Sequence, residues 1–165
     1  MAGDFWIDDA QVEDLPAITA LLNRTAATTT ASWHEYPKSE AEMAEWFAAR
    51  KRDYTVLAAR DASGFLGYAT YGAFRVPSGY RLSAEHSLYV REDARGRGIG
   101  KALLAALIDK GRAQGLHILI GGIDSDNSLS IALHKAFGFE ETGRLPEVGR
   151  KFDRWLTLVF LQKRL

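Results

Sequence analysis

The chain has 165 residues, of which 47% are hydrophobic and 25% are charged, a balance typical of a globular domain with a core of its own. Its 21 basic residues offset its 21 acidic ones, so no overall charge favours nucleic acid or an anionic membrane as a partner. Cysteine is absent, which excludes disulfides, a thiolate nucleophile and thiolate metal ligands. We expect one domain over residues 1–165, located in the cytoplasm.

The first half of the chain predicts a short strand, two helices and a hairpin. The opening residues 1–6 lack the basic and long apolar run of a secretory leader. Asp14 is a plausible helix N-cap, and Ser39 with Glu42 has the spacing of a capping box at a second helix start. The polar run 25–32 should end the first helix. The expected strands are residues 5–8, 55–59 and 65–74, the last two joined by a turn at 61–64.

Strands and helices alternate in the second half. A strand at 84–90 leads directly into a glycine-rich loop, and apolar residues then recur at helical spacing from Ile99 until Gly115 ends the helix. An apolar strand is expected at 116–123. A short helix, a short strand after 138–140 and a final strand at 151–162 follow. This order predicts an α/β domain with a central mixed sheet.

The loop Arg95-Gly96-Arg97-Gly98-Ile99-Gly100 has the chemistry of a pyrophosphate site. Glycine lets the backbone approach a ligand closely, and the helix that follows directs free N–H groups and a partial positive charge at the loop. Two common phosphate motifs are excluded: the third glycine follows the second too soon for a dinucleotide fingerprint, and Lys101 is followed by alanine, unlike in a Walker loop. A plain surface turn is the alternative.

The strand and the loop together resemble the acyl-CoA signature of the GNAT N-acetyltransferases, in which Arg95-x-x-Gly98-x-Gly100 follows Ser87-Leu88-Tyr89-Val90. One branch, the phosphinothricin and methionine sulfoximine acetyltransferases, is similar over nearly the whole chain. Two positions depart from that branch: Thr157 stands where an acid is usual, and His34-Glu35 stands where many relatives carry an amide or another acid. The similar segments are 29–33, 71–75, 85–90, Asn127, 133–139, 149–152 and Trp155.

The resemblance implies a GNAT fold, of the α/β (α+β) class. A mixed, mostly antiparallel twisted sheet is flanked by helices, and two parallel strands splay apart at the acetyl-CoA site. The pantetheine arm would pair with the backbone of one of them, as an added strand does. The implied cofactor-binding residues are Leu88, Tyr89, Val90, Arg95, Gly96, Arg97, Gly98, Ile99, Gly100, Lys101, Asn127 and His134.

The implied reaction acetylates the α-amine of a small L-amino acid or analogue, such as methionine sulfoximine, methionine sulfone or a phosphinothricin-like compound. The amine must lose a proton before it attacks, and Glu85, on the strand that leads to the cofactor, is the candidate base. A solvated strand residue is the alternative for Glu85. His134 would donate a proton to the departing thiolate, bind the cofactor without catalysis, or belong to the core.

Arg75 is the candidate partner for the acceptor's carboxylate, since a planar guanidinium can donate two parallel hydrogen bonds to it. A surface arginine that caps a loop is the alternative. Trp33 would wall the acceptor pocket or pack in the core, and His86, on the opposite face of the strand from Glu85, is a weaker candidate base. The implied acceptor-binding residues are Trp33, Phe74, Arg75, Val76, Pro77, Glu85, His86 and Ser87.

No metal is expected, because the four histidines lack ligand spacing and acyl transfer from a thioester needs none. The branch commonly forms homodimers, and the aromatic segment around Trp155 would suit an interface. Two other functions stay open. One is acetylation of a protein amine or a polyamine, and the other is an acyl-CoA sensor without catalysis.

Overall fold

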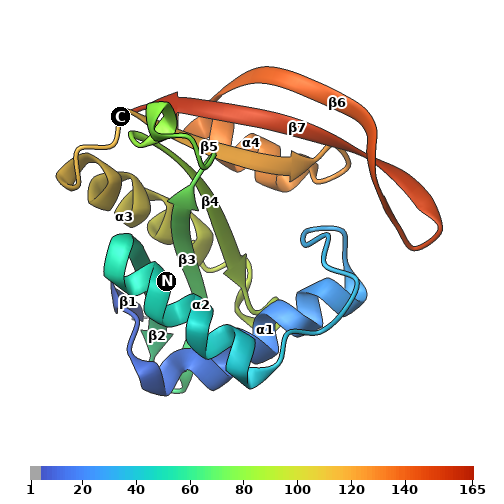
Figure 1. Cartoon of the computed structure of the whole chain (residues 1–165). Helices are drawn as coiled ribbons and strands as arrows, with labels where there is room; N and C mark the ends of the chain where they lie inside the picture. Colours follow the sequence, from blue (N-terminus) through green and yellow to red (C-terminus); the bar gives the residue numbers. More distant parts are fainter. Residues whose placement is uncertain (1–4) are drawn as a thin grey trace.

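A computed structural model describes residues 5–165, which form a seven-stranded sheet and four α-helices (Figure 1). The leader prediction falls partly on residues 1–4, outside the described residues. None of the helices in residues 5–165 is long and apolar enough to cross a membrane. The elements are β1 (Phe5–Asp9), α1 (Leu15–Thr28), α2 (Glu40–Asp53), β2 (Thr55–Asp61), β3 (Gly64–Ala73), β4 (Ser83–Val90), α3 (Ile99–Ala113), β5 (Ile118–Asp124), α4 (Ser128–Ala136), β6 (Glu140–Lys151) and β7 (Arg154–Arg164).

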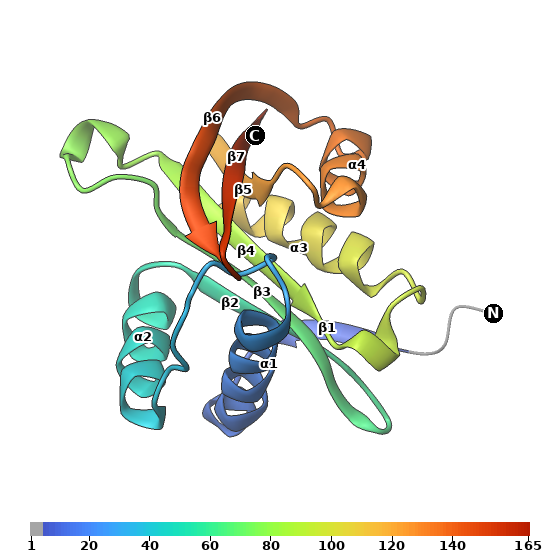
Figure 2. The same cartoon turned by 90° about the vertical axis from the view of Figure 1, so that its right-hand side faces the viewer.

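The sheet is mixed and mostly antiparallel, as the sequence predicts. Its strand order is β1-β2-β3-β4-β5-β7-β6, and β4 with β5 is the one parallel pair within residues 5–165. The helices lie on both faces, with α1 and α2 on one face and α3 and α4 on the other (Figure 2). The functional residues of the central strands are therefore divided between two separate layers.

Alternation along β4 decides which layer each of its side chains enters. Leu88 and Val90 pack with α3 in one hydrophobic cluster, and Tyr89 packs with α1 and α2 in the other. By the same alternation His86 lies on the α3 side of the sheet and Glu85 on the α2 side. The two neighbours consequently serve different parts of the molecule.

Helix α3 follows from its sequence in a simple way. Ile99, Leu103 and Leu107 recur every four residues and are buried against the sheet. Gly98 caps the N-terminus in the left-handed conformation with a φ of 84°, and Gly115 leaves the C-terminus with a φ of 74°. The glycine loop is thereby fixed directly at the helix N-terminus.

The C-terminal strands differ from the prediction. The strand after Phe139 is long, with 12 residues, and it pairs with β7 through two register shifts. The expected start of the last strand at Lys151 is wrong, because Lys151 ends β6 and the turn follows it. Phe152 and Asp153 form that turn with φ values of 51° and 57°. Asn-Gly or Asp-Gly usually fills such a turn, so the sequence carried no signal for it.

Helix α1 also runs further than expected. The polar run 25–32 does not end it at once, and the helix continues to Thr28. The hydroxyl of Thr28 donates a hydrogen bond to the carbonyl oxygen of Arg24 one turn earlier, 2.8 Å away. In the same way, the hydroxyl of Thr29 donates to the carbonyl oxygen of Thr25. These bonds occupy the threonine hydroxyls without breaking the backbone ladder.

Candidate active site

Strands β4 and β5 pair over only half of β4. Residues Ser83–His86 face Ile118–Gly121, and beyond His86 the two strands separate. From Ser87 to Val90 the backbone groups of β4 that point towards β5 have no strand partner, although the opposite edge still pairs with β3. A cleft of about 790 Å³ opens beside this unpaired end of β4, next to α4 and the start of α3.

The cleft brings together most of the residues that the sequence predicts for cofactor binding. Its lining combines the unpaired end of β4, the glycine loop with Arg95 and Lys101, and the N-terminus of α4. The N-terminus of α3 adds free N–H groups and a partial positive charge. The predicted residues that line it are Leu88, Tyr89, Val90, Arg95, Gly96, Gly98, Ile99, Gly100, Lys101 and Asn127.

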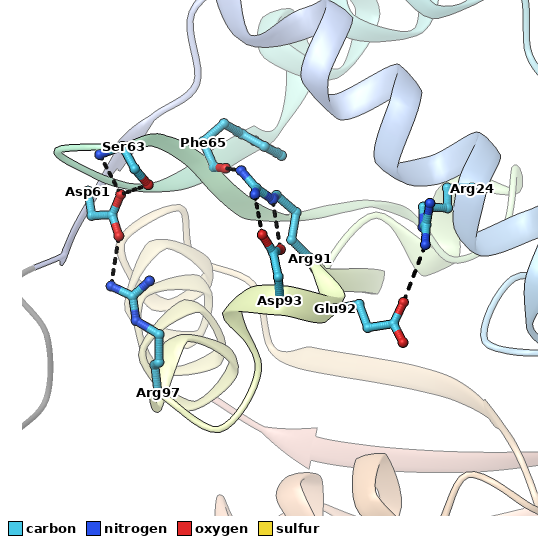
Figure 3. A network of polar contacts seen from close by, with 8 residues as sticks. All are labelled: Arg24, Asp61, Ser63, Phe65, Arg91, Glu92, Asp93 and Arg97. Atoms are coloured by element: carbon cyan, nitrogen blue, oxygen red, sulfur yellow. Dashed lines mark hydrogen bonds and ion pairs between the residues drawn. The ribbon is translucent and has the colours of Figure 1, made fainter.

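Arg97 is placed differently from its neighbours in the loop. Its side chain points to Asp61 at the end of β2, with an N–O distance of 2.7 Å (Figure 3). Hydrogen bonds from Ser63, together with the one from Arg97, lower the pKa of Asp61 to about 2. The Arg97 guanidinium thus ties the glycine loop to the β2–β3 turn and does not line the cleft.

Helix α4 carries two of the predicted residues. Asn127 caps it, and its side chain accepts a hydrogen bond from the backbone N–H of Ser130. His134 is 4% exposed and lines a small cavity of about 80 Å³ together with Leu88, Asn127 and Ser130, which also line the cleft. Burial lowers the pKa of the His134 imidazole.

His86 lies beside His134. It is 6% exposed, and its Nε2 is 2.7 Å from the Nε2 of His134. The sequence groups His86 with Glu85 among the acceptor-binding residues, but the rings of His86 and His134 both pack against the ring of Phe139 in the α3 layer, His86 tilted and His134 edge-on. The structure does not bring His86 to the face that Glu85 occupies.

Glu85 is half-buried between two glycines. Gly72 of β3 faces it across the strand pair, and a Cβ on Gly122 of β5 would lie 2.8 Å from its carboxylate. Burial raises the pKa of Glu85, and the positive charge of Arg75 acts in the opposite direction. A carboxylate held in this way is better suited to accept a proton near neutral pH than an ordinary glutamate.

Two consecutive glycines in β5 make room on both faces of the sheet. Gly122 leaves space for Glu85, and a Cβ on Gly121 would lie 3.0 Å from His86 and 3.5 Å from His134. Sequence reasoning missed this pair. A Gly-Gly step inside an apolar strand was its signal, because glycine in a strand often marks a close approach.

The sequence also gave no function to a second cavity, of about 370 Å³, on the α2 side of the sheet. Arg50 of α2 reaches into it, with its guanidinium 5.7 Å from the ring centre of Trp46 and 5.9 Å from that of Tyr54. It forms no ion pair within residues 5–165, and burial lowers its pKa. The lining includes Lys38, Trp46, Arg50, Tyr68, Thr70, Ser87 and Tyr89.

The signal for Arg50 was present in the sequence. It continues the apolar stripe of α2 one turn after Phe47, where a surface arginine would be out of place. A Cβ on Gly72 would overlap its guanidinium, so the missing side chain of that glycine is what lets Arg50 reach the sheet.

The remaining predicted acceptor residues are spread out. Arg75 is exposed, with its guanidinium 4.6 Å from the ring centre of Phe74, and Val76 is 97% exposed beside Pro77. Trp33 packs on Gly149 of β6. Of the acceptor residues that the sequence predicts, Ser87 alone is among those lining the α2-side cavity. Within residues 5–165 no cluster of three His, Asp or Glu side chains is placed to hold a metal ion.

Comparison with known proteins identifies the family. The family model described as "Acetyltransferase (GNAT) family" matches residues 18–139. An L-methionine sulfoximine/L-methionine sulfone acetyltransferase of Pseudomonas paraeruginosa is 51% identical over 96% of this chain and 94% of that protein.

Two solved structures are similarly close. A phosphinothricin acetyltransferase from Sinorhizobium meliloti in complex with AcCoA has a TM-score of 0.94 and 39% identity, covering 98% of this chain and 88% of that one. A ribosomal-protein-alanine N-acetyltransferase from Brucella melitensis has a TM-score of 0.95 and 46% identity, covering 97% and 99%. The chain belongs to the GNAT family of acetyltransferases.

Proposed function

We propose that the chain transfers the acetyl group of acetyl-CoA to the α-amine of a small L-amino acid or analogue, of the methionine sulfoximine, methionine sulfone or phosphinothricin kind. The observation that carries this proposal is the position of Glu85, whose pKa burial raises. It lies on the same face of β4 as Ser87, which lines the α2-side cavity, and three residues before Leu88, the first residue of β4 that lines the cleft. The names of the relatives support the acceptor class.

The cleft fits an acyl-CoA in three respects. The unpaired edge of Leu88–Val90 offers N–H and C=O groups to the amides of a pantetheine arm. The α3 N-terminus, Arg95 and Lys101 suit a pyrophosphate. Acetyl-CoA supplies a thioester whose carbonyl carbon an amine can attack. Third, a backbone N–H near Val90 would bind the carbonyl oxygen of the thioester as negative charge develops on that oxygen.

Glu85 would take a proton from the acceptor's ammonium group, directly or through one water. The raised pKa brings its affinity for a proton closer to that of the amine. Arg75, whose charge acts on Glu85, would bind the acceptor's carboxylate beside that amine. His134 would provide a proton to the sulfur that leaves.

The α2-side cavity would hold the acceptor's side chain. The cationic groups of Arg50 and Lys38 line it. Among the described residues 5–165, Glu42 is the one acidic side chain in the lining, and Ser39 and Lys38 hold it by hydrogen bonds. Such a cavity favours an acceptor with oxygen atoms at its far end, such as a sulfone, a sulfoximine or a phosphinate. A polyamine would bring positive charge to positive charge, which argues against it.

A thiol-release assay with an acceptor panel tests the proposal. The panel contains L-methionine sulfoximine, L-methionine sulfone, phosphinothricin, spermidine and a peptide with an N-terminal alanine, and mass spectrometry identifies each acetylated product. We expect turnover with the first three. Absence of thiol release with every free amino acid, in protein that binds acetyl-CoA by calorimetry, would contradict the proposal and favour an acyl-CoA sensor.

A second acceptor class is supported by one comparison. The Brucella melitensis structure is described as a ribosomal-protein-alanine N-acetyltransferase, and it resembles this chain over nearly its full length. If the alanine peptide were acetylated with a higher kcat/KM than every amino acid in the panel, a protein α-amine would replace the small acceptor. The α2-side cavity, with a volume of about 370 Å³, has the size of a small-molecule site and favours the small acceptor.

A homodimer is part of the proposal. The β6–β7 hairpin carries exposed apolar side chains, among them Phe152 at 53% and Trp155 at 61%. Exposed groups of this size are typical of interfaces between protein chains. Sedimentation should give a dimer for the wild type, and Trp155→Glu should shift it towards the monomer. A monomeric wild type at micromolar concentration would contradict this part.

A further inference from the structure

The imidazoles of His86 and His134 meet end to end in the α3 layer. Their Nε2 atoms are 2.7 Å apart, their ring planes differ by 28°, and their ring centres are 5.0 Å apart. If the rings were stacked face to face with their Nε2 atoms this close, the distance between the ring centres would be shorter than the one observed. The in-plane lone pairs of the two Nε2 atoms therefore point along the line that joins the rings. A hydrogen must lie between the two atoms, because two lone pairs at this distance repel each other.

The other nitrogen of each ring faces a backbone carbonyl. Nδ1 of His86 is 2.8 Å from the carbonyl oxygen of Ile120, and Nδ1 of His134 is 2.7 Å from that of Ser130. A carbonyl oxygen only accepts hydrogen bonds, so each Nδ1 must carry a hydrogen and donate it. In the ligand-free arrangement these bonds orient both rings, and neither ring can give up its Nδ1 hydrogen to serve the contact between them.

These three contacts require one hydrogen each, whereas two neutral imidazoles carry one hydrogen each and supply only two. We infer that His86 and His134 hold one additional proton, shared between their Nε2 atoms, and that this proton is the one delivered to the leaving sulfur. The pair is then a single cation with three hydrogens on four ring nitrogens.

One neutral arrangement competes with the shared proton. If His134 carried its hydrogen on Nε2, its Nδ1 could accept from the hydroxyl of Ser130, which lies 3.5 Å away. That lone pair would then face the Ser130 carbonyl oxygen at 2.7 Å. The long contact does not offset the close approach of two acceptors, so the geometry favours a hydrogen on Nδ1.

Burial alone would leave both rings neutral, because it lowers the pKa of each of them. Two features act in the other direction. A hydrogen bond between an imidazolium and an imidazole is charge-assisted and therefore strong. Asp124 of β5 is the one charged side chain lining the same small cavity within residues 5–165, and its buried Oδ2 has no hydrogen-bond partner there. Glu85 of β4 points to the opposite face.

The part assigned to this proton rests on the proposed acetyl transfer. When the carbon–sulfur bond of the thioester breaks, its electron pair goes to sulfur. The contact between the two Nε2 atoms opens with the proton on His134, whose ring turns its Nε2 from His86 towards that sulfur and protonates it to give a thiol. The pair becomes neutral. One of the two protons that the acceptor's ammonium loses restores it, and the other passes to solvent, so the charges balance. His134 is the candidate donor, and His86 is a positioning residue that stores the proton with it.

Nitrogen-15 NMR of the imidazoles in the ligand-free protein tests the inference without turnover. Assignment uses His86→Gln and His134→Gln, with His117→Gln as a matched control at an exposed histidine. At pH 7 we expect hydrogens on both Nδ1 atoms and matching shifts, intermediate between protonated and unprotonated, at both Nε2 atoms. One fully unprotonated nitrogen in the pair, with two hydrogens in total, would overturn the inference and would leave the acetyl transfer untouched.

Kinetics of His86→Gln test the role of the proton. The glutamine amide can still donate to Nε2 of His134, so the hydrogen bond remains while the additional proton is lost. We expect kcat to fall by about 10²-fold, with the KM for acetyl-CoA unchanged, and His117→Gln to behave as wild type. An unchanged kcat in a variant that melts like the wild type would overturn the role, even if NMR finds three hydrogens.

Discussion

Glu85 shows how a single residue can be tested through its pH dependence. Its carboxylate must be ionised to accept a proton, and burial raises its pKa, so kcat/KM should rise as the pH passes upward through a value above that of an ordinary glutamate. In Glu85→Gln we expect this rise to disappear and kcat to fall by about 10²-fold. Steady-state rates measured between pH 4 and 9, in steps on the order of one pH unit, test both expectations.

The control for that variant is Glu45→Gln, since Glu45 is exposed on α2. It should leave both the rate and the pH profile unchanged. A Glu85→Gln enzyme that keeps the wild-type profile would show that another group, or solvent, removes the proton from the amine.

The role of Arg50 can be tested by replacing its charge. Its guanidinium lines the α2-side cavity without an ion-pair partner in residues 5–165. A charge-assisted hydrogen bond contributes about 1.5–3 kcal/mol, so in Arg50→Met the KM for L-methionine sulfone should rise about tenfold or more. The KM for acetyl-CoA should not change. The protein should be no less stable, because methionine keeps the apolar stem and removes a buried charge.

Arg52→Met is the matched control for Arg50→Met, because Arg52 lies on the same helix and pairs with Asp53 at the surface. Kinetics with both substrates and thermal unfolding separate the two variants. If Arg50→Met and Arg52→Met had the same KM for the acceptor, Arg50 would not bind the acceptor.

The glycine loop depends on the backbone conformation of Gly98. Gly98 has a φ of 84° and no atom lies within 4 Å of where its Cβ would be, so conformation and not space limits substitution. Gly98→Ala should cost about 1–2 kcal/mol of stability. The loop can relieve this strain only by turning its N–H groups away from the cleft, which should raise the Kd for acetyl-CoA.

Gly143→Ala serves as the control, because Gly143 lies in a strand, has no atom within 4 Å of its Cβ position and lacks a positive φ. Gly98→Asn should have a stability and a Kd for acetyl-CoA between those of Gly98→Ala and Gly143→Ala, because asparagine tolerates the left-handed conformation better than alanine does. Calorimetry and chemical denaturation give both quantities. An alanine variant that binds acetyl-CoA as tightly as the wild type would contradict the placement of the loop.

The elements were predictable where local chemistry decides them. The apolar stripe of α3, the glycine at each of its ends and the capping box of Ser39 are local patterns, each set by residues close together in the sequence. The structure confirms each of them. The length of β6 and the turn after Lys151 depend instead on pairing with β7 and on a turn without glycine. No local pattern carries that information, because partners distant in the sequence supply the stabilisation.

The candidate site shows the same division at the scale of the whole molecule. The glycine loop closely follows the cleft-lining end of β4 in the sequence, and the family resemblance adds Asn127 from α4, so most of the cofactor residues could be grouped in advance. The α2-side cavity joins α2 with β3 and β4, and the histidine pair joins β4 with α4. Arg50 and the partnership of His86 with His134 could be found only once the sheet had brought distant segments together.

Lys151 links two segments that lie far apart in the sequence. It is 3% exposed at the end of β6, and its ammonium group donates to the carbonyl oxygens of Thr29, at 2.8 Å, and of Ser32. This joins the β6–β7 hairpin to the segment after α1, whose residues Thr29 to Ala31 line the cofactor cleft. Lys151→Met would leave two carbonyls without a donor, at about 1–3 kcal/mol of stability.

The same substitution should loosen the segment after α1, so limited proteolysis should cut it there sooner, and acetyl-CoA should slow that cleavage by holding the cleft wall in place. Lys135→Met, at an exposed position on α4, should change neither stability nor cleavage. If Lys151→Met unfolded at the wild-type denaturant concentration, the hairpin would be held by its strand pairing alone. The ammonium group would then have no part in joining the C-terminal strands to the cofactor cleft.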